Sequence, residues 1–233
     1  MEQGVPLAPP FTTDVLSVRP DTMRLLRNQG GRMTGSTDID TLLRIMPNDH
    51  GADERVDWVA VEAHLGSSLP GDYQAFMAAY GGGAVDNLVI LPPLPTGNGW
   101  SGSISEHSTQ LRDLWDIDGG VPGVPSGADR VLPWGTGCNG DELGWLMTDP
   151  DPDLWPVVVW RRHESPPWAL FECGMAGFIR GLMTADFDEC PLSDLSLWGR
   201  VGSFVHHQEQ RRRFQAGLDP MTGEPDPYAD MFA

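Results

Sequence analysis

Three aspartates at alternate positions, Asp149, Asp151 and Asp153 in the run TDPDPD, form the clearest candidate for metal chemistry in the chain. Carboxylates at this spacing open the calcium loop of EF-hand proteins. The rest of that loop is missing, because its sixth position is Leu154 rather than Gly and its twelfth is Trp160 rather than Glu. We therefore interpret the run as a solvated turn between two strands, and we predict no metal site.

The residue types that serve as nucleophiles and zinc ligands are not arranged for that chemistry. No Ser occupies the centre of a G-x-S-x-G motif, and a catalytic role for Cys138 would need a positioned histidine. The neighbouring His206 and His207, even with Cys190, lack a fourth ligand at suitable spacing, and we expect this pair to face solvent on a helix. We predict a protein that is not an enzyme and has no cofactor. A hydrolase built on acidic loops ranks third, after two kinds of binding protein.

The net charge of −18 lies entirely in the middle of the chain. Residues 36–199 contain 25 Asp and Glu against 7 Arg, the flanks balance, and the whole chain has no Lys. Such a surface repels nucleic acid and membranes, and it attracts basic proteins. The acidity indicates either a basic protein partner or a role in solubility alone.

The glycine run Gly81–Gly83 follows a short helix pattern instead of preceding one. A phosphate-binding loop needs its glycines after a strand and before a helix, so that backbone N–H groups point at the anion. Here Tyr73, Phe76, Met77 and Tyr80 form the apolar side of a helix that starts near Pro70, and Gly81 directly follows it. The run is therefore interpreted as a helix cap and a turn.

The periodicity of the chain predicts helices followed by strands and a closing helix. This order indicates an α+β fold, with helices packed on one mostly antiparallel sheet in a single domain with flexible tails. Apolar spacing of three and four residues predicts helices over residues 39–46, 57–65, 70–80, 106–116 and 175–183. Short Val-, Trp- and Leu-rich runs predict strands within residues 87–94, 130–136, 142–148, 155–162 and 168–172.

The predicted domain covers residues 36–190. Residues 1–35 are interpreted as a disordered N-terminal segment, and residues 191–233 as an extension with a short helix and then a disordered tail. The start of the chain has no secretory pattern, and no run is long enough to span a membrane. With three widely spaced cysteines, these features predict a cytoplasmic protein.

Two segments together resemble the SUKH superfamily, the domain of the Smi/Knr-type fungal cell-wall regulators. The first is DWVAVEAHLGSSLPGDYQAFMAAYGGG and the second is CNGDELGWLMTDPDPDLWPVVVW, and the closing FIRGLM resembles the terminal helix of the family. The positions that carry the resemblance are Trp58, Leu65, Gly66, Leu69, Pro70, Tyr73, Gly81, Gly82, Asn139, Gly140, Asp141, Trp145, Trp155, Pro156 and Val157. The likeness covers roughly residues 37 to 185.

The resemblance implies an α+β fold without a catalytic site. Bacterial members are mostly immunity proteins that bind a cognate toxin, often a nuclease or deaminase, and block it. We therefore predict a binding protein that neutralises a toxin by covering a basic surface, with a regulatory or scaffold domain of the same fold as the alternative. The predicted partner-binding residues are Asp116, Asp118, Asp141, Glu142, Asp149, Asp151, Asp153 and Trp155.

Overall fold

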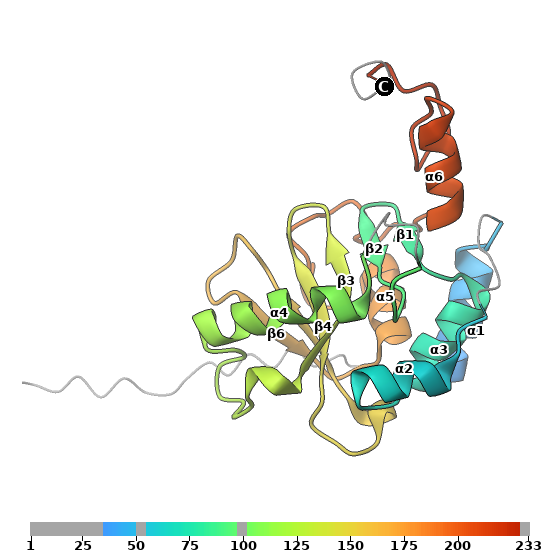
Figure 1. Ribbon diagram of the computed structural model, residues 1–233. Coiled ribbons are helices and arrows are strands. Elements are labelled where there is room, and N and C mark those ends of the chain that lie inside the picture. The colour runs from blue at the N-terminus through green and yellow to red at the C-terminus, as the bar shows by residue number, and fades with distance from the viewer. Residues whose placement is uncertain (1–34, 50–54, 97–101, 229–233) are drawn as a thin grey trace, which may run out of the picture.

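The computed structural model describes residues 35–49, 55–96 and 102–228, and Figure 1 shows how their helices and strands are arranged. The predicted disordered segment 1–35 therefore lies almost entirely outside the described residues. In chain order the elements are α1 (Gly35–Ile45), α2 (Trp58–Leu65), α3 (Gly71–Ala79), β1 (Gly83–Val85), β2 (Leu88–Ile90), α4 (Ile104–Asp118), η1 (Ala128–Arg130), β3 (Val131–Gly137), β4 (Glu142–Leu146), η2 (Pro152–Leu154), β5 (Val157–Trp160), β6 (Trp168–Phe171), α5 (Met175–Thr184), β7 (Phe204–His206) and α6 (His207–Gln215).

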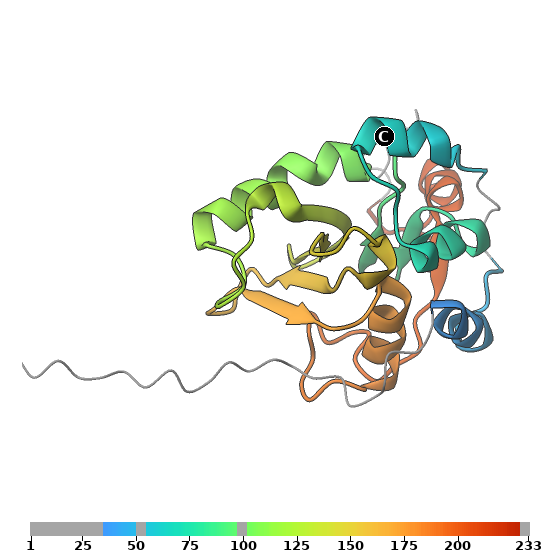
Figure 2. The same ribbon diagram turned by 90° about the horizontal axis from the view of Figure 1, so that it is seen from below.

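The strands form one antiparallel sheet in the order β6-β5-β4-β3-β2-β1-β7. This confirms the predicted α+β class with one mostly antiparallel sheet, in which β3 to β6 pair consecutively as a meander. The helices cover both faces of the sheet, with α4 on one face and α5 on the other, as the two views in Figures 1 and 2 show. β1 and β7 were not predicted, because the glycine run at β1 indicates a turn and the residues of β7 lead directly into the C-terminal helix α6.

The central strands are buried on both faces, which explains why their sequences are apolar without a clean alternation. On β5, Val158 packs toward α4, whereas Val157 and Val159 join the larger core on the opposite face. Gly144 on β4 has no side chain, and a Cβ there would lie 2.7 Å from Leu111 of α4. The helix can therefore pack directly against the strand backbone.

The larger core lies between the sheet and the helices α1, α3 and α5, and it is rich in aromatic rings. The predicted buried side of α3 is confirmed, since Tyr73, Phe76, Met77 and Tyr80 are all fully buried. Tyr73 packs edge-on against Trp145 with ring centroids 5.2 Å apart. Its hydroxyl donates to the Leu91 carbonyl at 2.7 Å, so this buried polar group is satisfied.

Several positions that carry the family resemblance have structural roles in this core and its turns. Gly66 ends α2 with a φ of 80°, and Gly81 follows α3 with a φ of 76°, a region that favours glycine. Gly83 lies so close to β7 that a Cβ would be 2.4 Å from the Val205 carbonyl oxygen. The glycine run therefore ends α3 and lets β7 pack close to the backbone of β1.

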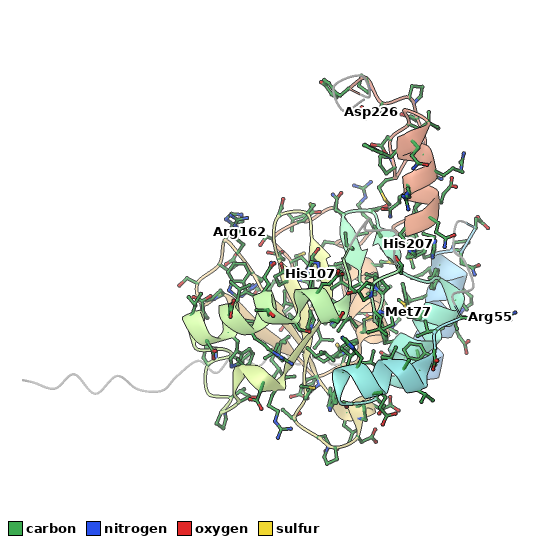
Figure 3. The ribbon with its side chains drawn as sticks, in the orientation of Figure 1. Arg55, Met77, His107, Arg162, His207 and Asp226 are labelled. Atoms are coloured by element: carbon green, nitrogen blue, oxygen red, sulfur yellow. The ribbon has the colours of Figure 1, made fainter. Side chains whose placement is uncertain are left out.

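The C-terminal segment 191–233 contributes to the domain that was predicted to end at residue 190. β7 pairs with β1 in the register Gly83 to His206, and Phe204 is buried against Tyr80 with ring centroids 5.1 Å apart. After β7, α6 extends away from the body, with His207 at its base and Asp226 near its far end (Figure 3). Residues 217–226 form a hairpin closed by a bridge between Leu218 and Pro225, and Arg213 of α6 donates to two carbonyls of its turn.

The histidine pair was expected to face solvent, and that expectation is wrong. His206 is the last residue of β7 and His207 is the first of α6, and both side chains are buried. Their ring centroids lie 4.1 Å apart, and Nδ1 of His207 lies 2.9 Å from the Gly82 carbonyl oxygen. The expectation failed because the strand that precedes the helix was not recognised.

Candidate functional site

The structure separates the eight predicted partner-binding residues into two groups. Five lie at or near the surface, namely Asp116, Asp118, Asp149, Asp151 and Asp153. The other three, Asp141, Glu142 and Trp155, are buried with exposed fractions of 1%, 5% and 3%. Side chains buried in this way are not available to a partner, so these three have other roles.

Asp141 fastens the C-terminal segment to the sheet. Its Oδ2 accepts from the Ser193 backbone N–H at 2.6 Å, and its Oδ1 accepts from the Ser193 hydroxyl at 2.7 Å. Oδ1 also accepts from the backbone N–H of Arg162, which follows β5. One buried carboxylate thus joins three segments of the chain through charge-assisted hydrogen bonds.

Glu142, the first residue of β4, is a buried carboxyl group on the side of the sheet that α4 covers. Its Oε1 accepts from Nε2 of Gln110 on α4 at 2.6 Å. Burial raises the pKa of Glu142 from 4.5 to about 7, with a further increase from the charge of Asp141 and an opposing decrease from the Gln110 hydrogen bond. Glu142 is therefore a titratable group of the interior rather than a surface contact.

The run of alternating aspartates forms a turn whose carboxylates bind backbone groups. Asp149 and Asp151 accept from the N–H groups two residues ahead, and Asp153 accepts from the Gly71 N–H at the start of α3. Trp155 is buried beneath this turn and donates from Nε1 to the Asp149 carbonyl at 2.7 Å. Among the described residues, no group of His, Cys, Asp or Glu side chains is arranged to hold a metal ion.

Exposed acidic side chains gather on the outward side of α4, where Glu106 accepts a hydrogen bond from the hydroxyl of the N-cap residue Ser103. Exposed residues recur at helical spacing on this side, namely Glu106, Thr109, Gln110, Asp113, Asp116 and Ile117. The carboxylates of Asp113 and Asp116 have no hydrogen-bond or ion-pair partner within the described part of the chain. Asp118 differs, because its Oδ2 accepts from Nε1 of Trp160 at 2.7 Å.

These acids occupy the end of α4 where they are least favourable for the helix. The C-terminus of a helix carries a partial negative charge, and neighbouring carboxylates destabilise it by about 0.3–1 kcal/mol each. Asp116 and Asp118 lie in the last turn, which contains no basic residue. The stability of α4 therefore does not explain why acids occupy these positions.

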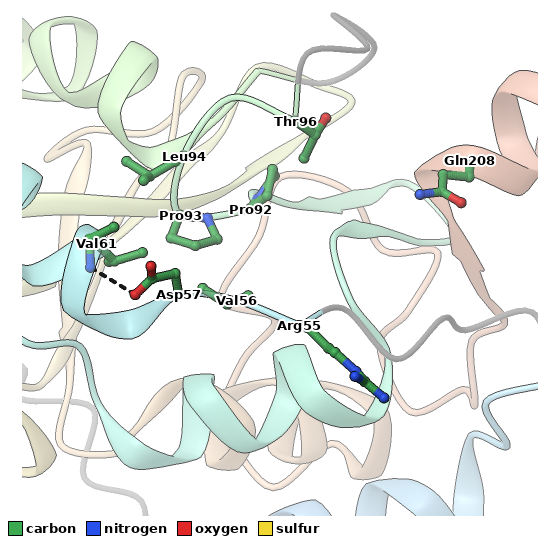
Figure 4. Close-up of a pocket in the computed structure, with 10 residues that line it drawn as sticks. Arg55, Val56, Asp57, Val61, Pro92, Pro93, Leu94, Thr96 and Gln208 are labelled. Carbon is green, nitrogen blue, oxygen red and sulfur yellow. Dashed lines mark hydrogen bonds between the residues drawn. The ribbon is translucent and has the colours of Figure 1, made fainter.

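A groove of about 470 Å³ lies between the start of α2, residues 92–96 and Gln208 of α6. Its apolar lining consists of Val56, Ala60, Val61, Pro92, Pro93 and Leu94. In Figure 4, Val61 and Leu94 lie at one end, and Arg55 and Gln208 lie at the other. The sequence analysis did not identify this groove, because its residues are distant in the chain and follow no motif.

Cys138 and His107 both have a pKa shifted by burial. Burial and the charge of Asp194 raise the pKa of the exposed Cys138 thiol, and thiols with a raised pKa are weak nucleophiles at neutral pH. Burial lowers the pKa of His107 on α4. No hydrogen bond joins these two described side chains, and neither lines the groove.

No family model, curated protein or solved structure matches this chain. The SUKH resemblance therefore stays a prediction that rests on the motif positions. Among the described helices, none combines the length and the apolar character required to cross a bilayer.

Proposed function

We propose that this chain is a cytoplasmic binding protein of the SUKH type that neutralises a cognate bacterial toxin by covering a basic surface. The observation that carries the proposal is the position of the carboxylates on α4. They are exposed, Asp113 and Asp116 have no hydrogen-bond or ion-pair partner among the described residues, and Asp116 lies at the unfavourable end of the helix. Acids retained at such positions are well suited to steer and hold a basic partner.

Two further features support the same function. The α+β fold is the architecture that the resemblance implies, and its motif glycines and Tyr73 have defined structural roles. Toxins that act on nucleic acid are often basic where their substrate binds, so an acidic protein can occupy the same surface. Inhibition of this kind is steric and electrostatic, and it needs no turnover and no cofactor.

The test starts with capture of partners by the tagged full-length chain from its native cells at low salt. Each captured domain is then expressed alone in a heterologous host, with and without this chain. We expect one stoichiometric partner with a basic domain that arrests growth, and we expect co-expression of the chain to restore growth. Capture of only metabolic or envelope proteins, or of domains that do not arrest growth, would contradict the immunity function and favour the regulatory alternative.

A further inference from the structure

The second unusual surface of the molecule is the outward side of α2. This helix has the sequence WVAVEAHL, capped by Asp57 at its start and Gly66 at its end. Only Val61 is fully buried, whereas Val59 is 80% exposed and Ala60 and Ala63 are also exposed. A surface helix normally presents mostly polar residues to water, but here Val59, Ala60 and Ala63 are exposed beside only two polar side chains, Glu62 and His64.

The exposed side of α2 continues into the groove. Ala60 belongs to both, and the opposite wall of the groove is formed by Pro92 and Pro93. The Pro92 carbonyl accepts from the Ile104 N–H at 2.9 Å, which joins this wall directly to the first residue of α4. In both Figures 1 and 2, α2 lies beside the N-terminal end of α4 along one side of the molecule.

We propose that the outward sides of α2 and α4, with the groove between them, form one docking face for a basic protein partner. This inference rests on the proposed function and specifies its contact surface. The partner that fits is an apolar anchor surrounded by Arg and Lys side chains. Its apolar part covers Val59 and Ala63, and its cations face Glu106, Asp113 and Asp116.

Charge decides between this partner and a second copy of the chain. Association of two copies through this face would bring their α4 carboxylates together in a protein of net charge −18, which is unfavourable. A basic partner neutralises the same carboxylates. Arg55 lies at one end of the groove, but the exposed carboxylates of α2 and α4 outnumber it, so the face selects a cationic protein and disfavours self-association.

The two halves of the face have separable roles. Exposed carboxylates act mainly on the association rate through long-range attraction, which salt screens. Apolar contacts that exclude water act mainly on the dissociation rate. Variants of α4 should therefore slow binding at low salt, whereas variants of α2 should shorten the lifetime of the complex.

The test uses a synthetic amphipathic helix of Leu, Ala and Arg as the probe, with association and dissociation rates measured on the full-length chain over a series of salt concentrations. Val59→Gln with Ala63→Gln should raise the dissociation rate about tenfold. Asp113→Asn with Asp116→Asn should lower the association rate about threefold at low salt and flatten its salt dependence. Matched controls elsewhere on the surface are Leu195→Gln with Val201→Gln, and Asp49→Asn with Asp188→Asn.

The outcomes separate this inference from the proposed function. A probe that does not bind, or rates that change equally in the controls and in the α2 and α4 variants, would overturn the docking face. The same variants are then applied to the partner that restores growth in the co-expression test. If the wild-type chain protects the cells and the α2 variant binds that partner as long as wild type does, the immunity function holds and the docking face is wrong.

Discussion

Carboxylates occupy two opposite settings in this protein, the turn that leads into β4 and the outward side of α4. Asp141 and Glu142 are buried, and each accepts hydrogen bonds from distant segments of the chain. Asp113 and Asp116 are exposed, and their carboxylates have no hydrogen-bond or ion-pair partner in the described chain. The contrast shows that residue type alone does not separate an acid that holds the fold together from an acid that is free to bind.

The largest expected difference between the two regions is in stability. Asp141→Ala leaves two backbone N–H groups and the Ser193 hydroxyl without their acceptor, and we expect a loss of about 4 kcal/mol in the free energy of unfolding. Asp113→Ala should change it by no more than about 0.5 kcal/mol. Urea denaturation monitored by tryptophan fluorescence measures both. Similar losses for the two variants would mean that Asp113 supports the fold as much as Asp141 does.

The buried carboxyl group of Glu142 should make the free energy of unfolding depend on pH. Its folded-state pKa of about 7 lies above the ordinary value of 4.5, so its contribution to stability is complete below pH 4.5 and is lost as the pH rises through about 7. Glu142→Gln lacks this loss and should gain about 3 kcal/mol relative to wild type between about pH 4 and about pH 8. Asp72 has a pKa raised by burial and shares this sign, so only the difference between the two proteins isolates Glu142.

In that experiment, urea midpoints are compared at matched pH values. A difference between wild type and Glu142→Gln that does not vary with pH would mean that Glu142 titrates like an exposed carboxylate. Glu142 would then not differ in its titration from the exposed carboxylates of α4.

The third prediction concerns a buried acid that is paired with a cation. Arg180 on α5 donates to Asp38 of α1 at 2.7 Å, and a Cβ on the neighbouring Gly177 would lie 3.0 Å from the same carboxylate. Arg180→Met keeps much of the packing but leaves Asp38 unpaired, and we expect a loss of about 2 kcal/mol. Restoring the stability by adding Asp38→Asn would show that the unpaired charge causes the loss. A double variant as unstable as the single one would mean that the loss comes from packing or from the second partner of Arg180, Asp186.

The smallest expected effect has the opposite sign. Asp116→Asn removes a negative charge from the last turn of α4, and we expect a gain of about 0.3 kcal/mol in the free energy of unfolding at low salt. Thermal unfolding at low and high salt measures it, since salt should abolish the gain. A loss of stability would mean that this carboxylate supports the fold, which would weaken the case that it serves binding.

The sequence predicts the long elements and misses what depends on distant partners. The aromatic spacing of α3 and the apolar runs of β3 to β6 carry enough local signal to place them. Asp141 reads as a surface turn residue because its partner Ser193 is 52 residues away and no local pattern indicates it. A signal for α2 was present, since WVAVEAHL contains six apolar residues, more than its buried side requires.

The position of β7 in the sheet has a consequence for how the protein is made. β7 pairs with β1, whose partner residues precede it by about 120 positions, and Phe204 closes part of the aromatic core. A ribosome must therefore synthesise the chain beyond His206 before the backbone edge of β1 can be covered. Incomplete chains expose an unpaired strand beside uncovered aromatic rings, features that promote aggregation and attract chaperones. The last strand of the sheet thus distinguishes finished molecules from unfinished ones.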